Sequence, residues 1–420
     1  MKTKAVRIYG KDDLRLDEFE LPEMKENEIL AKVISDSICM SSYKATKQGS
    51  DHKRIPDDVN INPTIIGHEF SGVIISVGKK WQHKFKSGEK FSIQPALNYK
   101  GSLDAPGYSF RWIGGNATYV LIPSEVMEMD CLLPYDGAEF FLASLSEPMS
   151  CVIGAFHANY HTRSGSYIHE MGIKEGGNLA ILAGVGPMGL AAIDYALHCD
   201  RKPGLMVVTD IDQKRLDRAA GLHSPEEAEK QGIHLVYVNT SNPATAVNDL
   251  KALTNGKGFD DVFVFAPVKQ VVEQADQLLA FDGCMNFFAG PADPGFKAEF
   301  NFYNVHYAFT HIVGTSGGNT DDMREALKMM AEGKINPAGM ITHIGGLDAV
   351  IETTKHLPSI PGGKKLIYTH KEFPLVALDE LSTGAATFPF MKELDNLVKK
   401  NGGLWSLEAE NYLISNAPNI

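Results

Sequence analysis

Residues 179–189 read Leu-Ala-Ile-Leu-Ala-Gly-Val-Gly-Pro-Met-Gly, an apolar run that continues directly into a glycine-rich turn. The turn has the spacing G-x-G-x-x-G, and a helical pattern begins near Met188. Glycines let the backbone come close to a pyrophosphate, and the free N–H groups at the start of a helix bind its charge. Asp210 closes the next apolar run about twenty residues further on, where an acidic residue binds the adenosine ribose hydroxyls. Together these features favour a dinucleotide site over a glycine-rich turn without a ligand.

The choice between the two nicotinamide cofactors depends on the charges near Asp210. A carboxylate at this position repels a 2′-phosphate, which favours NAD(H) over NADP(H). Lys214, Arg215 and Arg218 lie nearby and could hold that phosphate, so NADP(H) stays open. The candidate cofactor-binding residues are Gly184, Gly186, Pro187, Met188, Gly189, Asp210 and Arg215.

Strand and helix patterns alternate through the middle of the chain. Strands are predicted at 179–183, 206–210, 234–238, 261–266 and 285–289. Helices are predicted between them at 188–198, 213–220, 246–253 and 269–279. This alternation is typical of βαβ units, so we expect an α/β fold with a doubly wound parallel sheet, a Rossmann domain.

The two ends of the chain have a different texture. Residues 1 to about 148 consist of short β-runs separated by glycine-containing turns, which predicts a β-rich domain. Helical patterns return at 320–335, with Thr320 at the expected N-terminus, and near 391–399 and 407–414. The apolar faces of the last two helices suggest docking on the body of the protein or on a neighbouring subunit. The predicted domains are a catalytic domain of residues 1–155 and 305–370, a dinucleotide-binding domain of 156–304, and a helical C-terminal extension of 371–420.

Composition excludes several classes of protein. The chain has 420 residues, of which 44% are hydrophobic and 22% charged, so it is not a disordered or fibrous protein. Its net charge is −12 without a basic stripe, which argues against nucleic acid or an anionic membrane as a partner. The five cysteines are odd in number and scattered, which favours a reducing compartment. No signal peptide is recognisable, and we expect a cytoplasmic protein.

Four residues from distant stretches offer metal ligands: Cys39, His68, Glu69 and Glu147. Taken singly, each has an ordinary explanation, such as a buried thiol or a turn carboxylate. Together they supply one thiolate, one imidazole and one or two carboxylates, a set that zinc accepts in a catalytic site. Sequence spacing alone does not bring them together.

The motifs Gly67-His68-Glu69, Glu147-Pro148 and the turn at 184–189 resemble those of the zinc-dependent medium-chain dehydrogenase/reductase family, which includes alcohol and sorbitol dehydrogenases. The likeness runs from about residue 2 to residue 368. It implies a GroES-like catalytic domain beside the Rossmann domain, and a homodimer or homotetramer assembled through the nucleotide domains. It also implies that Cys39, His68 and Glu147 bind the catalytic zinc, with Glu69 as an alternating or outer ligand.

Two further positions are assigned by this resemblance. Ser41 matches the hydroxyl that relays a proton between the substrate oxygen and the cofactor ribose; without the zinc it would be a turn hydroxyl. Lys44 stands where alcohol dehydrogenases often carry a proton-relay histidine, so the route by which the proton leaves the site is not assigned.

Many relatives hold a structural zinc with four cysteines, but residues 95–118 contain no cysteine. We therefore expect one catalytic zinc and no structural zinc.

Within the family, the chain resembles the branch that acts on sugar and polyol phosphates. The implied reaction transfers hydride between a nicotinamide cofactor and a substrate of the L-sorbose 1-phosphate to glucitol 6-phosphate type, with zinc as the Lewis acid. A basic loop could clamp the phosphate or simply be solvated; its residues are Lys44, Lys47, His52, Lys53 and Arg54.

Three alternatives remain open. A free polyol or secondary-alcohol dehydrogenase would bind the same metal without the phosphate. A zinc-free quinone or enone reductase need not keep Cys39, His68 and Glu147 together. A non-enzymatic nucleotide-binding protein would require that this ligand set be accidental.

Overall fold

The computed structural model describes residues 1–163 and 165–420. The chain divides into two compact units. Unit 1 consists of Met1–Glu147 and Asn319–Ile420, and unit 2 of Pro148–Gly318. The domain boundaries predicted at 155/156 and 304/305 both fall inside unit 2, and the predicted extension of 371–420 is part of unit 1.

Unit 2 is built on a six-stranded parallel sheet in the order β13-β12-β11-β14-β15-β16. Its strands are β11 (Asn178–Leu182), β12 (Leu205–Asp210), β13 (His234–Asn239), β14 (Phe259–Val264), β15 (Leu279–Phe287) and β16 (His311–Val313). The strand order reverses direction at β11, which is the point where doubly wound sheets bind their ligands. The predicted doubly wound Rossmann sheet is confirmed.

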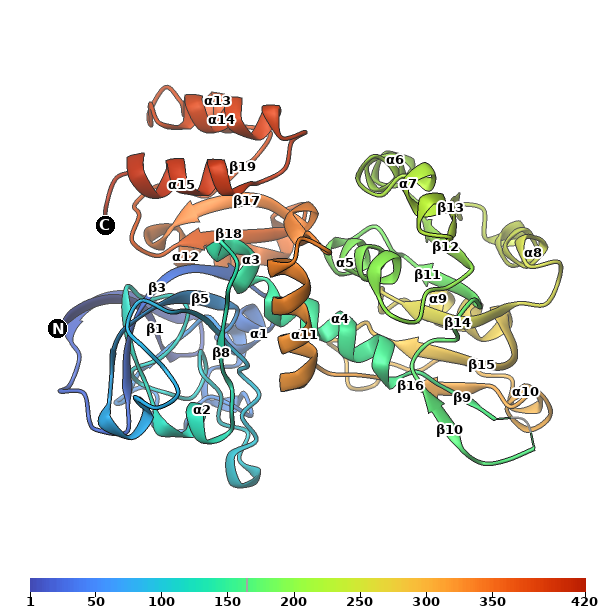
Figure 1. Ribbon diagram of the computed structural model, residues 1–420, viewed down its shortest axis with the longest axis horizontal. Helices are drawn as coiled ribbons and strands as arrows, with labels where there is room; N and C mark the ends of the chain where they lie inside the picture. Colours follow the sequence, from blue (N-terminus) through green and yellow to red (C-terminus); the bar gives the residue numbers. More distant parts are fainter. Residues whose placement is uncertain (164) are drawn as a thin grey trace. The chain divides into compact units, whose positions relative to one another are not determined.

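Helices cover both faces of this sheet (Figure 1). They are α4 (Ser146–Ala158), α5 (Pro187–His198), α6 (Gln213–Leu222), α7 (Pro225–Lys230), α8 (Pro243–Leu253), α9 (Lys269–Leu278) and α10 (Phe302–Tyr307). Leu250 of α8 and Val272 of α9 pack in one core with Val262 of β14. On the opposite face, Phe156 of α4 stacks on Phe263 with ring centroids 4.6 Å apart. Two short antiparallel strands, β9 (Tyr160–Thr162) and β10 (His169–Met171), complete the unit.

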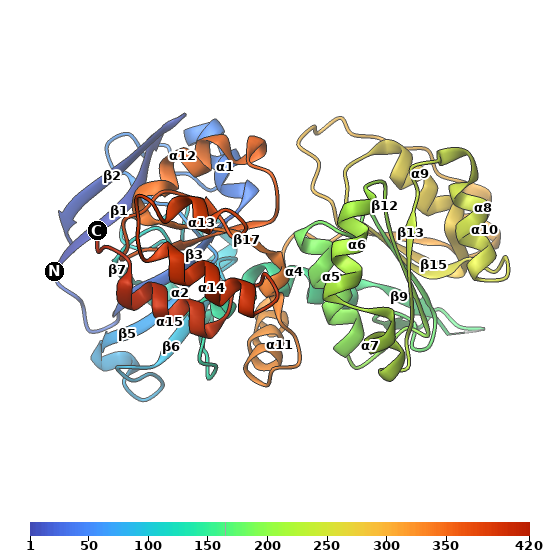
Figure 2. The same cartoon turned by 90° about the horizontal axis from the view of Figure 1, so that it is seen from above.

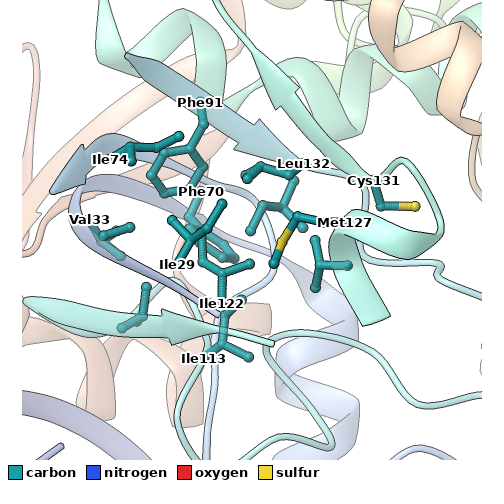
Figure 3. Packing of buried hydrophobic residues seen from close by; sticks show 14 of the residues in the cluster. Ile29, Val33, Phe70, Ile74, Phe91, Ile113, Ile122, Met127, Cys131 and Leu132 are labelled. Carbon is teal, nitrogen blue, oxygen red and sulfur yellow. The ribbon is translucent and has the colours of Figure 1, made fainter. Parts of the chain in front are cut away.

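Unit 1 holds an eight-stranded sheet in the order β19-β17-β18-β3-β5-β6-β8, with β7 also paired to β3. Its strands are β3 (Ile29–Ile38), β5 (Phe70–Val77), β6 (Lys90–Ile93), β7 (Tyr119–Ile122), β8 (Leu132–Pro134), β17 (Ile341–Gly346), β18 (Lys364–Tyr368) and β19 (Val376–Ala377). A second sheet contains β1 (Lys2–Gly10), β2 (Asp13–Glu20) and β4 (Thr64–Ile65). Figure 3 shows the core beneath these strands, where the buried rings of Phe70 and Phe91 meet edge to face. The β-rich domain is confirmed.

The remaining helices of unit 1 are α1 (Met40–Gln48), α2 (Ser124–Glu128), α3 (Phe140–Ser144), α11 (Thr320–Ala331) and α12 (Val350–His356). The prediction that α11 begins at Thr320 is confirmed, and the residue that caps it is the preceding Asn319. Asn319 accepts the N–H of Asp322 and donates its own N–H to the Asp322 carboxylate, which forms a capping box.

The C-terminal segment packs on its own unit. It contains α13 (Leu381–Gly384), α14 (Met391–Lys400) and α15 (Leu407–Asn416), of which α14 and α15 lie side by side (Figure 2). The Trp405 indole N–H donates to the Tyr368 hydroxyl at 2.7 Å. The buried carboxylate of Glu410 accepts the N–H groups of Phe140 and Phe141, at the start of α3. Of the two predicted docking modes, the structure shows the one on the body of the protein.

Across the part of the chain that the structure describes, no helix combines the length and the apolar character that crossing a bilayer requires.

Candidate metal centre and nucleotide site

The pairing of β3 with β5 brings three of the candidate ligands together. Cys39 directly follows β3 and is the N-cap of α1, whereas His68 and Glu69 directly precede β5. Because the two strands are antiparallel, the end of one lies beside the start of the other. The Cys39 sulfur, a His68 ring nitrogen and a Glu69 carboxylate oxygen all lie within 4.8 Å of one another. A thiol, an imidazole and a carboxylate at this spacing fit a zinc ion.

Hydroxyl groups surround the His68 ring. The Ser42 Oγ lies 3.4 Å from Nδ1, and the Ser41 Oγ lies 3.1 Å from Nε2. The Ser41 hydroxyl also donates to the Cys39 sulfur at 3.1 Å. Burial lowers the pKa of His68 to about 4, so the imidazole is neutral and keeps a lone pair for a metal. Burial also raises the pKa of the Cys39 thiol to about 12, and a metal must displace that proton when it binds.

Glu69 is held by a lysine from the other end of the chain. Lys364 Nζ donates to both Glu69 carboxylate oxygens, at 2.5 and 2.6 Å, and the Ser37 hydroxyl donates as well. Burial acts to raise the pKa of Glu69, but Lys364 and His68 outweigh it and the pKa is lowered. Lys364 sits on β18, which pairs with β3, so the sheet places the ammonium beside the carboxylate. Both oxygens are therefore occupied by one cation.

Asp36 supports the backbone of the same turn. Its Oδ1 accepts the N–H of Glu69 at 3.2 Å, and its Oδ2 has no hydrogen-bond partner among the described residues. Burial, with the charge of Glu69, raises the pKa of Asp36 well above its usual range. A Cβ at Gly115 would lie 2.1 Å from Asp36 Oδ1, and Gly67 has a φ of +94°. The glycine of Gly67-His68-Glu69 is thus required by the backbone.

The other predicted site residues, Glu147 and Lys44, differ in how closely they are connected to the group of Cys39, His68 and Glu69. Glu147 is in the first turn of α4, outside the three-residue group, but its charge contributes to raising the pKa of both Cys39 and Lys364. Lys44 is half-buried on α1, and the described residues show no hydrogen bond or ion pair between its amine and Cys39, His68 or Glu69.

Sequence reasoning missed two neighbours of the metal group, Lys364 and Tyr108. The Tyr108 hydroxyl lies 3.4 Å from His68 Nε2, and the two ring centroids are 4.8 Å apart. Tyr108 belongs to no motif that sequence inspection could have found. Lys364 did leave a signal, because Lys364 and Lys365 open an apolar run that forms a fully buried strand.

The glycines of the nucleotide turn have three different structural roles. A Cβ at Gly184 would lie 2.6 Å from Ile181 Cγ2, so the turn after β11 is tight. A Cβ at Gly189 would lie 2.2 Å from the Gly184 carbonyl oxygen, so α5 packs directly on the turn. A Cβ at Gly186 would meet only Arg215 Nη2, at 3.6 Å, which leaves this position open for a ligand. These are the roles that a pyrophosphate-binding turn requires.

The start of α5 is arranged for an anion. Gly186 is its N-cap and provides no capping side chain, and Pro187 and Met188 begin the helix. Asp210 ends β12, where its Oδ1 accepts the N–H groups of Ile211 and Asp212 at 2.9 and 3.0 Å. Arg215 directs Nη1 toward Asp210 Oδ2, at 3.9 Å, and Nη2 toward Gly186. An acid for the ribose and a cation beside the turn are both in place.

A parallel nucleotide-binding sheet, together with a β-rich unit that carries a Cys-His-Glu group, defines the class of two-domain, nucleotide-dependent oxidoreductases. The family model "Zinc-binding dehydrogenase" matches residues 187–332, and "Alcohol dehydrogenase GroES-like domain" matches residues 25–130. The chain belongs to the zinc-binding dehydrogenase family. This membership confirms the predicted GroES-like and Rossmann domains and the predicted class of enzyme.

Several relatives match over nearly their full length, and two of them have names that describe a reaction. The chain is 53% identical to L-sorbose 1-phosphate reductase of Klebsiella pneumoniae, covering 100% of this chain and 98% of the relative. It is 52% identical to mannitol-1-phosphate 5-dehydrogenase of Aliivibrio fischeri, covering 98% and 97%. Among solved structures, 2R,3R-butanediol dehydrogenase from Bacillus subtilis shares the fold with a TM-score of 0.68 at 21% identity, covering 87% of this chain and 99% of that one.

Proposed function

We propose that this protein is a zinc-dependent oxidoreductase that transfers hydride between a nicotinamide cofactor and a ketose phosphate or polyol phosphate. The observation that carries the proposal is the group of Cys39, His68 and Glu69, whose ligand atoms lie within 4.8 Å of one another and whose imidazole and carboxylate are buried. The substrate class is supported by two of the full-length relatives, which are named for sugar or polyol phosphates.

In this proposal Cys39, His68 and Glu147 bind one zinc ion, and Glu69 is its alternating or outer partner. Zinc, when bound, supplies a Lewis acid for the oxygen of the substrate. Ser42 fixes the His68 ring from its Nδ1 side, and Lys364 fixes the Glu69 carboxylate. We keep the expectation of a single zinc, because residues 95–118 offer no thiol for a structural site.

Ser41 is the proposed proton relay at the substrate oxygen. Its hydroxyl lies beside both Cys39 and His68, which is where a group that serves a metal-bound substrate must be. Lys44 is three residues further along α1 and so shares a helix face with Ser41. This spacing supports Lys44 as the next group in the proton's path, and a lower kcat in Lys44→Gln with an unchanged zinc content would test it.

We propose NAD(H) as the physiological cofactor, bound at Gly184, Gly186, Pro187, Met188, Gly189 and Asp210. The nicotinamide ring accepts or donates the hydride. The Asp210 carboxylate supports NAD(H), since it would face a 2′-phosphate, whereas Arg215 is the residue that would bind that phosphate in NADP(H). The ratio of kcat/KM for NADH to kcat/KM for NADPH decides between the two cofactors. If the enzyme uses NADPH, Arg215→Ala should lower kcat/KM for NADPH.

Assembly is proposed to occur through the edge of the unit 2 sheet, as a homodimer or as a homotetramer built from it. Among the described strands, β16 pairs only with β15, so one edge of β16 is open. Exposed apolar side chains surround it, including Phe281, Phe309 and Ile312. A second copy could extend the sheet across this edge. Ile312→Lys should yield a monomer by analytical ultracentrifugation.

The proposed location of the enzyme is the cytoplasm, and neither nucleic acid nor a membrane is proposed as a partner.

The substrate experiment uses the purified holoenzyme. It measures zinc content, then kcat/KM for a panel of ketose phosphates and the corresponding free sugars, with both nicotinamides. The proposal predicts about one zinc per chain and a clear preference for phosphorylated substrates. Hydride transfer that persists after zinc has been removed would contradict the metal part of the proposal. Equal activity on the free sugars would contradict the substrate class and favour a polyol dehydrogenase.

A further inference from the structure

The segment between the first two proposed metal ligands, which includes α1, carries basic residues in very different surroundings. Lys47 forms an ion pair with Asp12 at 2.7 Å, and Lys53 is exposed to solvent. Arg54 is half-buried, and its guanidinium carbon lies 5.5 Å from the centre of the Tyr108 ring. Only the last of these three side chains is directed toward the residues around the metal group.

The guanidinium of Arg54 has no counter-charge in the described residues. Its Nε atom is buried without a hydrogen-bond partner, and residues 1–163 and 165–420 show no ion pair to this side chain. A buried donor without an acceptor is costly, and more so in a charged group. The backbone here is fixed, because the Ser109 hydroxyl donates to the Arg54 carbonyl at 2.7 Å. A partly buried, unpaired cation on an anchored stretch of backbone is what a binding site for an anion contains before the anion arrives.

Tyr108 connects this cation to the metal group. Its hydroxyl lies 3.4 Å from His68 Nε2, while its ring is flanked by Arg54 and by the imidazole of His52. The His52 and Tyr108 rings are stacked, with centroids 5.7 Å apart and an interplanar angle of 9°. The two basic side chains are therefore one aromatic ring away from a proposed zinc ligand.

We propose that Arg54, assisted by His52, binds the phosphate group of the substrate. A phosphate monoester accepts two parallel N–H bonds from one guanidinium, which an ammonium cannot supply. A free polyol brings no negative charge to this position, so the contact would select phosphorylated substrates. The inference rests on the proposed function, because the metal group determines where the reacting carbon lies.

The test compares Arg54→Gln and Arg54→Lys with Lys53→Gln. The last variant removes one positive charge from the same loop at an exposed position and is the matched control. In Arg54→Gln, kcat/KM for the phosphorylated substrate should fall by about 10- to 100-fold, as expected for a lost charged hydrogen bond, while that for the free polyol changes little. Arg54→Lys should recover part of the loss, and Lys53→Gln should behave as the wild type.

A binding measurement separates this contact from any effect on catalysis. Inorganic phosphate is titrated calorimetrically into the wild type and Arg54→Gln, after zinc content and Tm have shown that both are intact. Weaker binding to the variant is expected, and equal binding would overturn the inference. A wild type without preference for phosphorylated substrates would overturn the proposed substrate class, and this inference with it. A preference that survives in Arg54→Gln, or that falls equally in Lys53→Gln, would overturn the inference alone.

Discussion

The nucleotide site of unit 2 and the metal group of unit 1 are assembled in opposite ways. The nucleotide turn is nearly contiguous: Gly184, Gly186 and Gly189 lie within six residues, and Asp210 ends the next strand. The metal group takes Cys39 from the end of β3, His68 and Glu69 from the start of β5, and Lys364 from β18. The first site follows from local geometry, whereas the second exists only because three strands pair in one register.

This difference has a consequence for substitutions. In a contiguous turn, each residue acts through its immediate neighbours, so a change should have a local and separable effect. In a group joined by sheet register, each residue holds the others in place, so removing one should disturb several. The four predictions below test this contrast.

The largest effect is expected for the proposed ligands themselves. His68→Ala and Cys39→Ala should lower kcat/KM by about 10³-fold or more, since a Lewis acid is worth several kcal/mol to the transition state. Zinc content, measured by atomic emission, should fall in parallel. The control is Cys199→Ala, which removes a buried thiol from unit 2 and should retain zinc. Near-normal turnover in either ligand variant would refute the metal assignment.

The next largest effect concerns the buried pair of Lys364 and Glu69. Lys364→Met leaves the Glu69 carboxylate buried without its cation, which should cost about 3–5 kcal/mol of unfolding free energy. The double variant Lys364→Met/Glu69→Gln should recover part of this loss, because the uncompensated charge is gone. Urea denaturation of the two variants measures the difference. Lys364 is the residue of β18 that contacts the metal group. If Lys364→Met alone is as stable as the wild type, the contact from β18 does not stabilise this group.

A smaller and more local effect is expected in the nucleotide turn. Gly189→Ala places a Cβ against the Gly184 carbonyl and should lower the free energy of unfolding by about 2 kcal/mol. Gly186→Ala meets only the end of Arg215, so it should leave Tm unchanged and raise the KM for the nicotinamide cofactor. Thermal unfolding and cofactor kinetics separate the two outcomes. Equal losses of stability in both variants would show that the glycine roles are not separable.

The same contrast explains what could be predicted from the sequence. Most predicted strands and helices of unit 2 lie within a few residues of their observed limits, because apolar periodicity and the glycine turn are local signals. The exception is β15, which begins at Leu279 and not at 285, and the short elements α7, α10 and β16 were not predicted. Glu69 was proposed from the motif Gly67-His68-Glu69, and Ser41 from the family resemblance. Lys364 and Tyr108 were not proposed, since each reaches His68 or Glu69 only through pairings that no single stretch of sequence encodes. The basic loop could be recognised, but nothing in its sequence distinguishes the unpaired Arg54 from the solvated Lys53.

The last effect is expected at Glu410, another long-range contact of unit 1, and it is confined to a narrow range of pH. Burial raises the pKa of this carboxyl to about 7, although it accepts the N–H groups of Phe140 and Phe141. A carboxyl whose pKa is higher in the folded than in the unfolded protein stabilises the fold at low pH, and this contribution is lost as the pH rises through the folded value. The free energy of unfolding should therefore fall by ~1–3 kcal/mol between about pH 4.5 and 7 on account of Glu410.

Glu410→Gln should remove this part of the pH dependence, because glutamine does not titrate; its single oxygen keeps an acceptor for only one of the two α3 amides, which lowers the stability by the same amount at every pH. Urea denaturation at half-unit pH intervals measures the slope in both proteins, with Glu408→Gln, an exposed residue of α15, as the control. Parallel curves for the wild type and Glu410→Gln would mean that the amides of α3 already compensate the buried charge. In that case the contact of Glu410 with α3 would behave like a contact within the nucleotide turn. The difference between contiguous sites and sites joined by distant segments would then be limited to the metal group.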